Sequence, residues 1–382
     1  MNNNKILIKR KLEKKIEKSL FKNKAIIITG PRQSGKTTLV KQIVKNIDQK
    51  YIWLNGDEPD VRSDFKDITS TELKSIVGDN KLLIIDEAQR IENIGITIKL
   101  IVDNLDIQVI ATGSSSFELA NRIKEPLTGR KIEFIMLPIS FEESAEHTSR
   151  GEEKRLLEQR LLFGCYPEVI VQPDRRLDYL KEISDSYLYK DILVWQKIKK
   201  PEKLEKLIQA LALQIGNEVS YNELAGTVGL DNETVENYIS VLEKAFIVFR
   251  LPSLSRNVRT ELKKKRKIFF YDNGIRNAVL NNFKSIDLRN DKGNLFENYL
   301  VSERLKFLFF NGINANRFFW RTKEQSEIDY IEERDGILNA YEFKMTKERI
   351  NIPGSFVKNY PQSRFNLITK KTYDKFLIQK KF

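Results

Sequence analysis

The stretch "GPRQSGKT" at positions 30–37 constrains what this chain can fold into more than any other feature. It follows the apolar run "AIIIT" and precedes a helical pattern, which is the strand–loop–helix setting of a phosphate-binding loop. Its glycines let backbone N–H groups turn inward around phosphates, and the positive end of the following helix points at them. The pattern predicts a nucleotide site made of Gly30, Pro31, Arg32, Gln33, Ser34, Gly35, Lys36, Thr37 and Thr38.

The chemistry of phosphoryl transfer assigns roles to a few side chains in and near this loop. Lys36 is expected to reach the β- and γ-phosphates of ATP, and the Thr37 hydroxyl to ligate Mg²⁺. The apolar run "LLII" ends in Asp86 and Glu87. Asp86 is expected to hold Mg²⁺ through water, and Glu87 to orient or deprotonate the attacking water. In the turn "ATGSSS", one of Thr112, Ser114 and Ser115 is a candidate sensor of the γ-phosphate, and Ser114 is assigned to the site.

The order of apolar runs predicts an α/β fold for the first part of the chain. Short runs at 25–30, 51–55, 81–87, 108–113 and 131–137 alternate with helical patterns. This rhythm indicates a mostly parallel sheet with helices on both faces. We expect four parts: a P-loop domain at 1–150, a helical connector at 151–200, a winged helix-turn-helix at 201–285 and a small α/β domain at 286–382.

Composition excludes several classes of protein. The 382 residues are 41% hydrophobic and 31% charged, which is typical of a globular chain. No stretch approaches the roughly 18 apolar residues of a membrane span, and the charged start has no apolar signal region. One cysteine and one histidine exclude an internal disulfide and a cysteine-based zinc site. A cytoplasmic location without membrane contact is the expectation.

The excess positive charge lies in the last third of the chain. The net charge is +13, and residues 251–382 contain 27 Lys and Arg against 15 Asp and Glu. A basic region of this kind favours a polyanion such as DNA as partner. The alternative is that these are ordinary solvated lysines.

A helix-turn-helix pattern precedes this basic region. Ser220 can cap one helix and Gly229 can end it, and Asp231 or Asn232 can cap a second helix. The basic residues of the expected wing are Arg256, Arg259, Lys263, Lys264, Lys265, Arg266 and Lys267. Acidic residues in the second helix would repel phosphates, so a protein-binding role is the alternative to DNA binding.

These features together resemble the AAA-type P-loop ATPases. More closely, the chain is similar to a prokaryotic subgroup with an uncharacterised C-terminal domain, through "TGPRQSGKTTL", "DEAQ", "TGSSS", "LTGR", "LPISFEE" and "FGCYPEV". The resemblance implies ATP and Mg²⁺ as cofactors. It also implies that Arg130 acts as an arginine finger on a neighbouring copy in a homo-oligomer. The alternative is that Arg130 pairs with a surface acid.

Four polar residues near the end of the chain are similar in order to the PD-(D/E)xK nuclease fold. Glu297 lies in a helical pattern, Asp329 in a strand, and Glu342 and Lys344 on one side of the next strand, after a turn at "RDG". In that fold the carboxylates bind Mg²⁺ and the lysine stabilises the reacting phosphate. Ile328 stands where that fold often has proline, and plain strand polarity is the alternative.

The leading hypothesis is therefore an ATP-hydrolysing enzyme that acts on or binds DNA, with a possible metal-dependent nuclease site. One rival is a regulator in which ATP switches an interaction surface and the C-terminal part is a scaffold. A protein remodeller is a third possibility, because fold alone does not determine function.

Overall fold

The computed structural model describes residues 7–113, 127–185, 200–255, 266–322, 324, 326–346 and 352–378. The chain forms two compact units. The first unit comprises Lys9–Pro138 and Lys244–Phe246. The second unit comprises Met1–Ile8, Ile139–Glu243 and Ile247–Phe382.

A five-stranded parallel sheet forms the centre of the first unit, with strand order β2-β3-β4-β1-β5. This confirms the predicted α/β class. The strands are β1 (Ala25–Thr29), β2 (Tyr51–Asn55), β3 (Leu82–Asp86), β4 (Gln108–Gly113) and β5 (Lys131–Ile135). Because β1 and β3 are buried on both faces, they are apolar at nearly every position.

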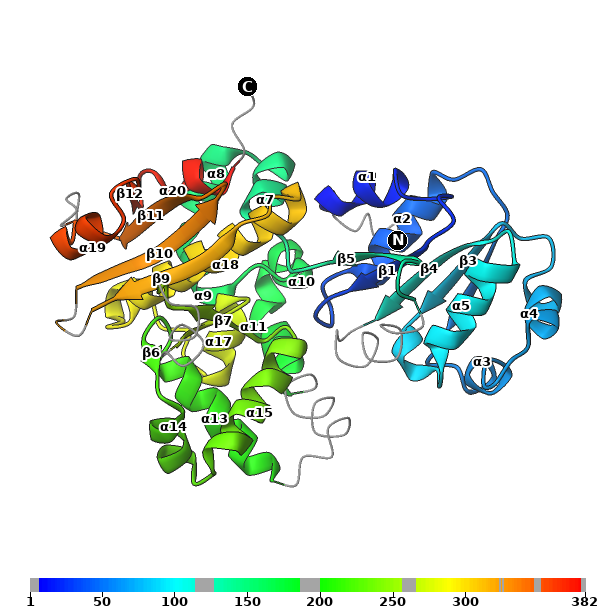
Figure 1. Ribbon diagram of the computed structural model, residues 1–382, viewed down its shortest axis with the longest axis horizontal. Helices are drawn as coiled ribbons and strands as arrows, with labels where there is room; N and C mark the ends of the chain where they lie inside the picture. Colours follow the sequence, from blue (N-terminus) through cyan, green and yellow to red (C-terminus); the bar gives the residue numbers. More distant parts are fainter. Residues whose placement is uncertain are drawn as a thin grey trace. The chain divides into compact units, whose positions relative to one another are not determined.

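Helices cover both faces of this sheet (Figure 1). One face contributes Ile27, Ile85 and Ala111 to a core that also contains apolar residues of α3, α4 and α5. The alternate residues Ile26 and Ile28 are equally buried on the other face, where α1 and α2 lie. The helices are α1 (Lys11–Glu17), α2 (Lys36–Lys45), α3 (Pro59–Asp64), α4 (Ser70–Val77), the 3₁₀ turn η1 (Ala88–Arg90) and α5 (Ile94–Asn104).

The second unit begins with short helices. Ser140 and Glu143 form a reciprocal capping box at the start of the first of them. The helices are α7 (Phe141–His147), α8 (Arg150–Arg155), α9 (Leu157–Phe163), α10 (Pro167–Val171), η2 (Pro173–Arg175) and α11 (Arg176–Ile183). The helical connector expected at 151–200 stays a prediction as a separate part of the chain.

Three helices and a three-stranded sheet follow in the order α13, β6, α14, α15, β7, β8. The sheet order β6-β8-β7 places the last strand between the other two. Ser220 caps α14, Gly229 ends it at φ 71°, and Asp231 accepts the backbone N–H of Thr234 at the start of α15. The elements are α13 (Pro201–Leu213), β6 (Glu218–Val219), α14 (Tyr221–Val228), α15 (Asn232–Lys244), β7 (Val248–Pro252) and β8 (Arg266–Phe270). The winged-helix assignment itself stays a prediction.

A four-stranded mixed sheet ends the second unit, with order β12-β11-β10-β9. Strands β10 and β11 are joined by a two-residue turn in which Asp335 and Gly336 both have positive φ, as the sequence "RDG" predicts. The elements are α17 (Asn273–Val279), η4 (Ile286–Leu288), α18 (Lys292–Asn311), β9 (Asn316–Arg321), β10 (Glu327–Arg334), β11 (Ile337–Lys344), α19 (Gly354–Asn359), β12 (Arg364–Thr369) and α20 (Tyr373–Leu377).

Helix α18 runs through the main core of the second unit. Its twenty residues are buried over most of their length, so the helix lacks a polar face. In the part of the chain that the structure describes, no helix combines the length and apolarity needed to cross a bilayer.

Candidate nucleotide site and C-terminal carboxylate cluster

The loop between β1 and α2 has the backbone of a phosphate-binding loop. Gly30, Gln33 and Gly35 have φ of 154°, 59° and 94°, values that glycine adopts without strain. A Cβ atom on Gly30 would lie 2.1 Å from the carbonyl oxygen of Met136, so no larger residue fits there without movement. The loop leads directly into α2, a ten-residue helix, and the N-terminus of a helix stabilises anions.

Lys36 lies over this loop and is only 5% exposed. Its Nζ donates to the carbonyl oxygens of Gly30 (3.0 Å) and Pro31 (2.8 Å). Burial lowers the pKa of Lys36 to about 8, although Glu87 and Asp86 oppose that change. Among the described residues this buried ammonium donates to backbone carbonyls, and it can exchange those contacts for phosphate oxygens.

Asp86 is the centre of the polar contacts at the end of β3. The hydroxyl of Thr37 lies 2.9 Å from Asp86 Oδ2, and the hydroxyl of Thr112 donates to Oδ1. The backbone N–H of Glu87 donates to Thr112 Oγ1 at 3.2 Å. Thr37 and Asp86 thus present oxygen atoms side by side, which is the ligand type that Mg²⁺ prefers. Thr112, at the end of β4, orients that carboxylate.

Two buried polar atoms of the loop also favour a phosphate ligand at this site. The hydroxyl of Ser34 is buried, and neither it nor Gln33 Oε1 has a hydrogen-bond partner among the described residues. Buried polar groups normally have partners, so a polar ligand is a natural complement to the loop. Thr38 is exposed on the first turn of α2, and Ser114 lies outside the described residues.

Glu87 has a left-handed backbone with φ 49° and follows directly on Asp86. Its Oε2 accepts a hydrogen bond from Gln89 Nε2 at 2.5 Å. The backbone of Gly56 comes so close that a Cβ there would lie 2.4 Å from the carbonyl oxygen of Glu87. Gly56 also donates its N–H to the carbonyl oxygen of Asp86 at 2.8 Å. The turn that positions Glu87 therefore depends on a glycine that sequence reasoning did not identify.

Arg10 is a second residue that sequence reasoning missed. It is 5% exposed, and its guanidinium donates to the carbonyl oxygens of Ser34 (2.9 Å) and Leu137 (2.6 Å). It thereby joins the phosphate loop to the segment that follows β5. A single arginine before a short helix matches no motif, so the sequence contains no signal for this contact.

Arg130 has the intrachain partner that the alternative reading expected. Its Nε lies 2.6 Å from Asp103 Oδ1, and both side chains are partly exposed. The carbonyl oxygen of Arg130 accepts the N–H of Ala25, which places it at the amino end of β1. Within its own chain, Arg130 is therefore at the opposite end of the sheet from the phosphate loop, and the in-trans role stays a prediction.

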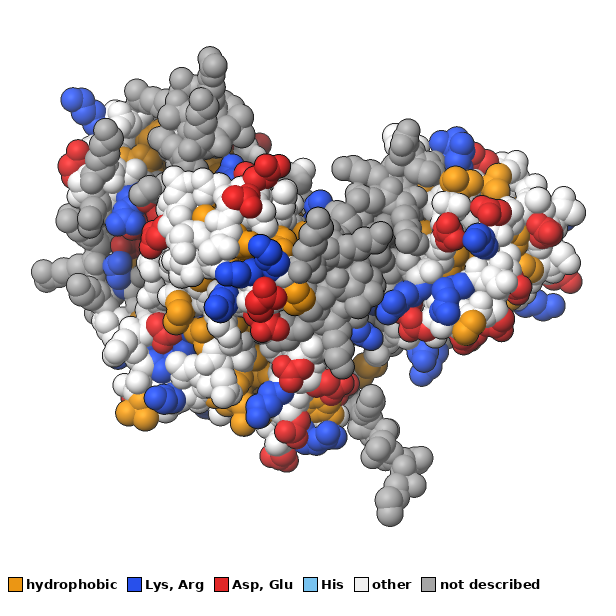
Figure 2. All heavy atoms as spheres, turned by 90° about the horizontal axis from the view of Figure 1, so that it is seen from below, with side chains coloured by type: hydrophobic (Ala, Val, Ile, Leu, Met, Phe, Trp, Pro, Cys, Tyr) orange, Lys and Arg blue, Asp and Glu red, His pale blue; other side chains and the backbone are white. Residues whose placement is uncertain are grey.

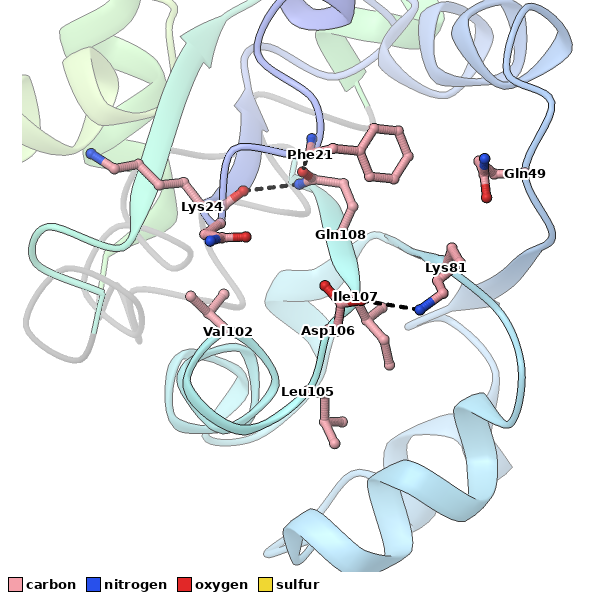
Figure 3. A pocket seen from close by; sticks show the side chains of 10 residues that line it. Phe21, Lys24, Gln49, Lys81, Val102, Leu105, Asp106, Ile107 and Gln108 are labelled. Atoms are coloured by element: carbon pink, nitrogen blue, oxygen red, sulfur yellow. Dashed lines mark hydrogen bonds and ion pairs between the residues drawn. The ribbon is translucent and has the colours of Figure 1, made fainter.

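A cavity of about 230 Å³ also lies at the amino ends of the strands (Figure 3). Gln108 spans its wall by donating to the carbonyl oxygen of Lys24 (2.9 Å) and accepting from the N–H of Phe21 (2.6 Å). Ligands of parallel α/β sheets bind at the carboxyl ends of the strands. This cavity is therefore not the nucleotide site.

The C-terminal residues of the predicted nuclease set lie on the paired strands β10 and β11. Tyr330 pairs with Tyr341, so Asp329 and Glu342 are the next positions along the two strands and face each other. Asp329 Oδ2 accepts the N–H of Phe343 at 2.8 Å. Lys344 Nζ lies 2.6 Å from Glu342 Oε1. A shared role for these three residues stays a prediction.

Glu297 does not complete a metal site with them. Lys267, which is 1% exposed, lies with its Nζ 2.9 Å from Glu297 Oε1 and 2.6 Å from Glu327 Oε1. In the described ranges, no three Asp, Glu, His or Cys side chains are arranged to hold one metal ion. The predicted metal set of Glu297, Asp329 and Glu342 therefore does not form such a group in the described residues, and one of its members, Glu297, is paired with a buried ammonium instead.

The electrostatics of this cluster follow from burial. Burial raises the pKa of Glu297, Asp329 and Glu342, and neighbouring carboxylates raise the pKa of each of the three further. Burial acts against the charged form of Lys267, but Glu297, Asp329 and Glu327 outweigh it and raise the pKa of Lys267. The carboxylates thus stabilise the ammonium that lies among them.

Lys267 is also not available as a wing residue for a polyanion, because it is buried. Arg266 is partly buried against Tyr221 and pairs with Glu236 at 3.5 Å. The other basic residues expected in the wing, 256–265, lie outside the described residues. On the face shown in Figure 2, Lys and Arg side chains of the described residues are interspersed with Asp and Glu.

Comparison with known proteins agrees with the phosphate-binding loop that the structure shows. Residues 22–145 match a family described as "AAA domain", so the first unit contains an AAA-type P-loop ATPase domain. Residues 154–285 and 292–374 match two domains of unknown function, DUF8612 and DUF4143.

Several curated relatives span most of the chain. Uncharacterized protein MJ1544 of Methanocaldococcus jannaschii is 26% identical over an alignment of 363 positions, which covers 88% of this chain and 79% of that protein. An uncharacterized protein of Haemophilus influenzae is 25% identical over an alignment of 276 positions, which covers 66% of this chain and 68% of that protein. Among solved structures, the Walker-type ATPase PABY2304 of Pyrococcus abyssi is 16% identical with a TM-score of 0.49, and covers 72% of this chain and 96% of that chain.

Proposed function

We propose that the first unit binds ATP with Mg²⁺ and hydrolyses its terminal phosphoanhydride bond. The observation that carries this proposal is the contact between the Thr37 hydroxyl and the Asp86 carboxylate, with Lys36 over the same loop. Mg²⁺ bound there would neutralise charge that develops on the phosphates. Its ligands on the protein would be Thr37 directly and Asp86 directly or through water.

The other contributions to binding and hydrolysis come from side chains and backbone groups of the protein itself. Lys36 binds the β- and γ-phosphates by giving up its bonds to the loop carbonyls. The backbone N–H groups at the start of α2 bind the same phosphates and need no reorganisation. Glu87 orients a water molecule for attack on the γ-phosphorus atom and takes its proton. Thr112 keeps the Asp86 carboxylate in place.

A pair of lysine variants on one helix tests this proposal. Lys36→Ala removes the phosphate-binding cation, so turnover should fall by about 10²-fold or more and binding of a fluorescent ATP analogue should weaken. Lys45→Ala is the matched control, because Lys45 is exposed in the last turn of the same helix. Equal turnover in the two variants would contradict the proposal.

We propose further that Arg130 completes the site of a neighbouring copy when the chain forms a homo-oligomer. Partial exposure of Arg130 supports this, because it can leave Asp103 at low cost. Inactive Lys36→Ala and Arg130→Ala chains should regain turnover when mixed, through interfaces that combine an intact loop with an intact arginine. Mixing that restores nothing, or a chain that stays monomeric with ATP, would exclude the in-trans role.

We propose DNA as the polyanion that the basic last third contacts. The net charge of +12 over residues 251–382 supports this, as does the element order of residues 201–270. Binding should weaken steeply with salt, which fluorescence anisotropy at several salt concentrations measures. Binding that is absent at low salt would favour the alternative of an ATP-switched protein-interaction module. Nuclease activity is not part of the proposal, because Lys267 is bonded within the carboxylate set.

A further inference from the structure

The carboxylate cluster of the second unit contains its own cation. Lys267, in β8, lies between Glu297 of α18 and Glu327 of β10, with its Nζ within 3 Å of both carboxylates. Asp329 is near enough to contribute to the electrostatic stabilisation of the ammonium. Two elements, α18 and β10, therefore place acidic groups around the one buried positive charge that β8 supplies.

Counting the charges shows how close this cluster is to a metal site. The cationic side chains that pair within it are Lys267, Arg321 and Lys344, and the acidic ones are Glu297, Glu327, Asp329 and Glu342. The set with all groups ionised has a net charge of −1. Loss of the Lys267 charge would leave −2, and buried like charges of that size need a counter-cation or protons.

Geometry distinguishes Lys267 from the other two cations. Lys344 and Arg321 are about one-third exposed, whereas Lys267 is 1% exposed. Lys344 bonds to Glu342 and Arg321 lies 3.7 Å from Glu327, so each of them meets the cluster from its edge. Only Lys267, among the described basic residues, pairs with both Glu297 and Glu327.

We infer that Lys267 is a tethered counter-ion that takes the position of a divalent metal, and that the cluster becomes a divalent-metal site when this ammonium is removed. The wild-type second unit then holds no resident metal. Its similarity in residue order to a nuclease site reflects a carboxylate arrangement that the chain neutralises internally.

Mn²⁺ binding to the full-length chain without nucleotide tests this inference. Lys267→Met removes the charge but keeps an unbranched apolar side chain of similar length. Isothermal titration should show one Mn²⁺ bound by Lys267→Met at least about tenfold more tightly than by wild type. The matched control Lys267→Arg keeps a cation and should bind Mn²⁺ no better than wild type. Adding Asp329→Asn to Lys267→Met should abolish the new site.

Two controls separate this site from other effects. Adding Asp86→Asn to Lys267→Met removes a ligand of the nucleotide site, so the new Mn²⁺ site should persist. If Lys267→Met fails to fold without metal, Mn²⁺ should restore its near-ultraviolet circular dichroism. Restoration would support the inference, and failure to restore it would overturn the inference.

Two further results would overturn it. One is a folded Lys267→Met chain that binds no additional Mn²⁺. The other is a wild-type chain that binds Mn²⁺ at a site lost in Asp329→Asn, because the cluster would then hold metal beside Lys267.

Discussion

Lys36 and Lys267 are both buried beside carboxylates, and they differ in the atoms that they contact. Lys36 donates to two backbone carbonyls of its own loop, and burial lowers its pKa to about 8. Lys267 is bonded to two carboxylates, which raise its pKa despite burial. The first lysine can therefore accept a foreign anion, whereas the second already has its anions. Burial next to acidic residues does not by itself make a ligand site.

The largest difference should appear when one carboxylate is neutralised at each site. Glu87→Gln keeps the shape of the side chain but removes the base, so ATP turnover should fall by about 10²- to 10⁴-fold while ATP stays bound. Asp329→Asn, the matched change in the second unit, should leave turnover unchanged. Steady-state phosphate release measures both, and equal turnover in Glu87→Gln and wild type would remove the role assigned to Glu87.

The free energy of unfolding should depend more on Lys267 than on Lys36, whereas ATP turnover depends on the site of Lys36. Lys267→Met leaves Glu297 and Glu327 without their shared partner, which should lower the free energy of unfolding by about 3–5 kcal/mol. Lys36→Met removes a charge that burial disfavours, so its effect should stay within about 1 kcal/mol. Urea unfolding measures both changes. A larger destabilisation by Lys36→Met than by Lys267→Met would contradict this prediction.

The pH dependence of nucleotide binding should follow Lys36 alone. Above a pKa of about 8 the free protein loses the Lys36 proton that phosphate binding requires, so affinity should fall by up to about tenfold per pH unit between pH 8 and 9.5. The free energy of unfolding should instead rise with pH over this range. The unfolded chain keeps this proton to higher pH than the folded chain does, so rising pH favours the folded state.

Titration of a fluorescent ATP analogue at several pH values checks this prediction. Lys36→Arg carries a charge that does not titrate in this range, so its affinity should depend less on pH. An affinity that is flat across this range in wild type would show that the Lys36 proton is not coupled to binding.

The smallest effect should come from Arg10, which contacts the loop through the backbone carbonyl of Ser34. Arg10→Met leaves the Ser34 and Leu137 carbonyls without this donor, so KM for ATP should rise severalfold while kcat changes less. Lys9→Met is the control, because the adjacent Lys9 is exposed. A fall in kcat alone would place Arg10 in the chemical step instead of in loop positioning.

Local features of the chain were predictable from the sequence. The turn at Asp335 and Gly336, the cap at Ser220 and the strand–loop–helix around Lys36 each depend on neighbouring residues. The facing of Asp329 and Glu342 follows from that turn, because a two-residue turn sets the register of its strands.

Contacts made across long sequence distances were not predictable in this way. Arg10 reaches Leu137 over 127 positions, and Lys267 reaches Glu297 over 30. Neither contact produces a periodicity or a residue spacing that can be recognised in the sequence. The sequence therefore places Lys267 among the basic residues of the expected wing, although its partners in space are the carboxylates of Glu297 and Glu327.

Helix α18 has a consequence for how the second unit can be divided. Residues 154–285 and 292–374 match separate families, and a cut between them would look harmless in the sequence. Yet Asn298 of α18 exchanges two hydrogen bonds with the backbone of Phe270 on the other side of that cut. A fragment that ends at residue 285 would lose the helix that fills its core and expose apolar surface to water. Such halves should aggregate when produced alone and should recover solubility only when made together.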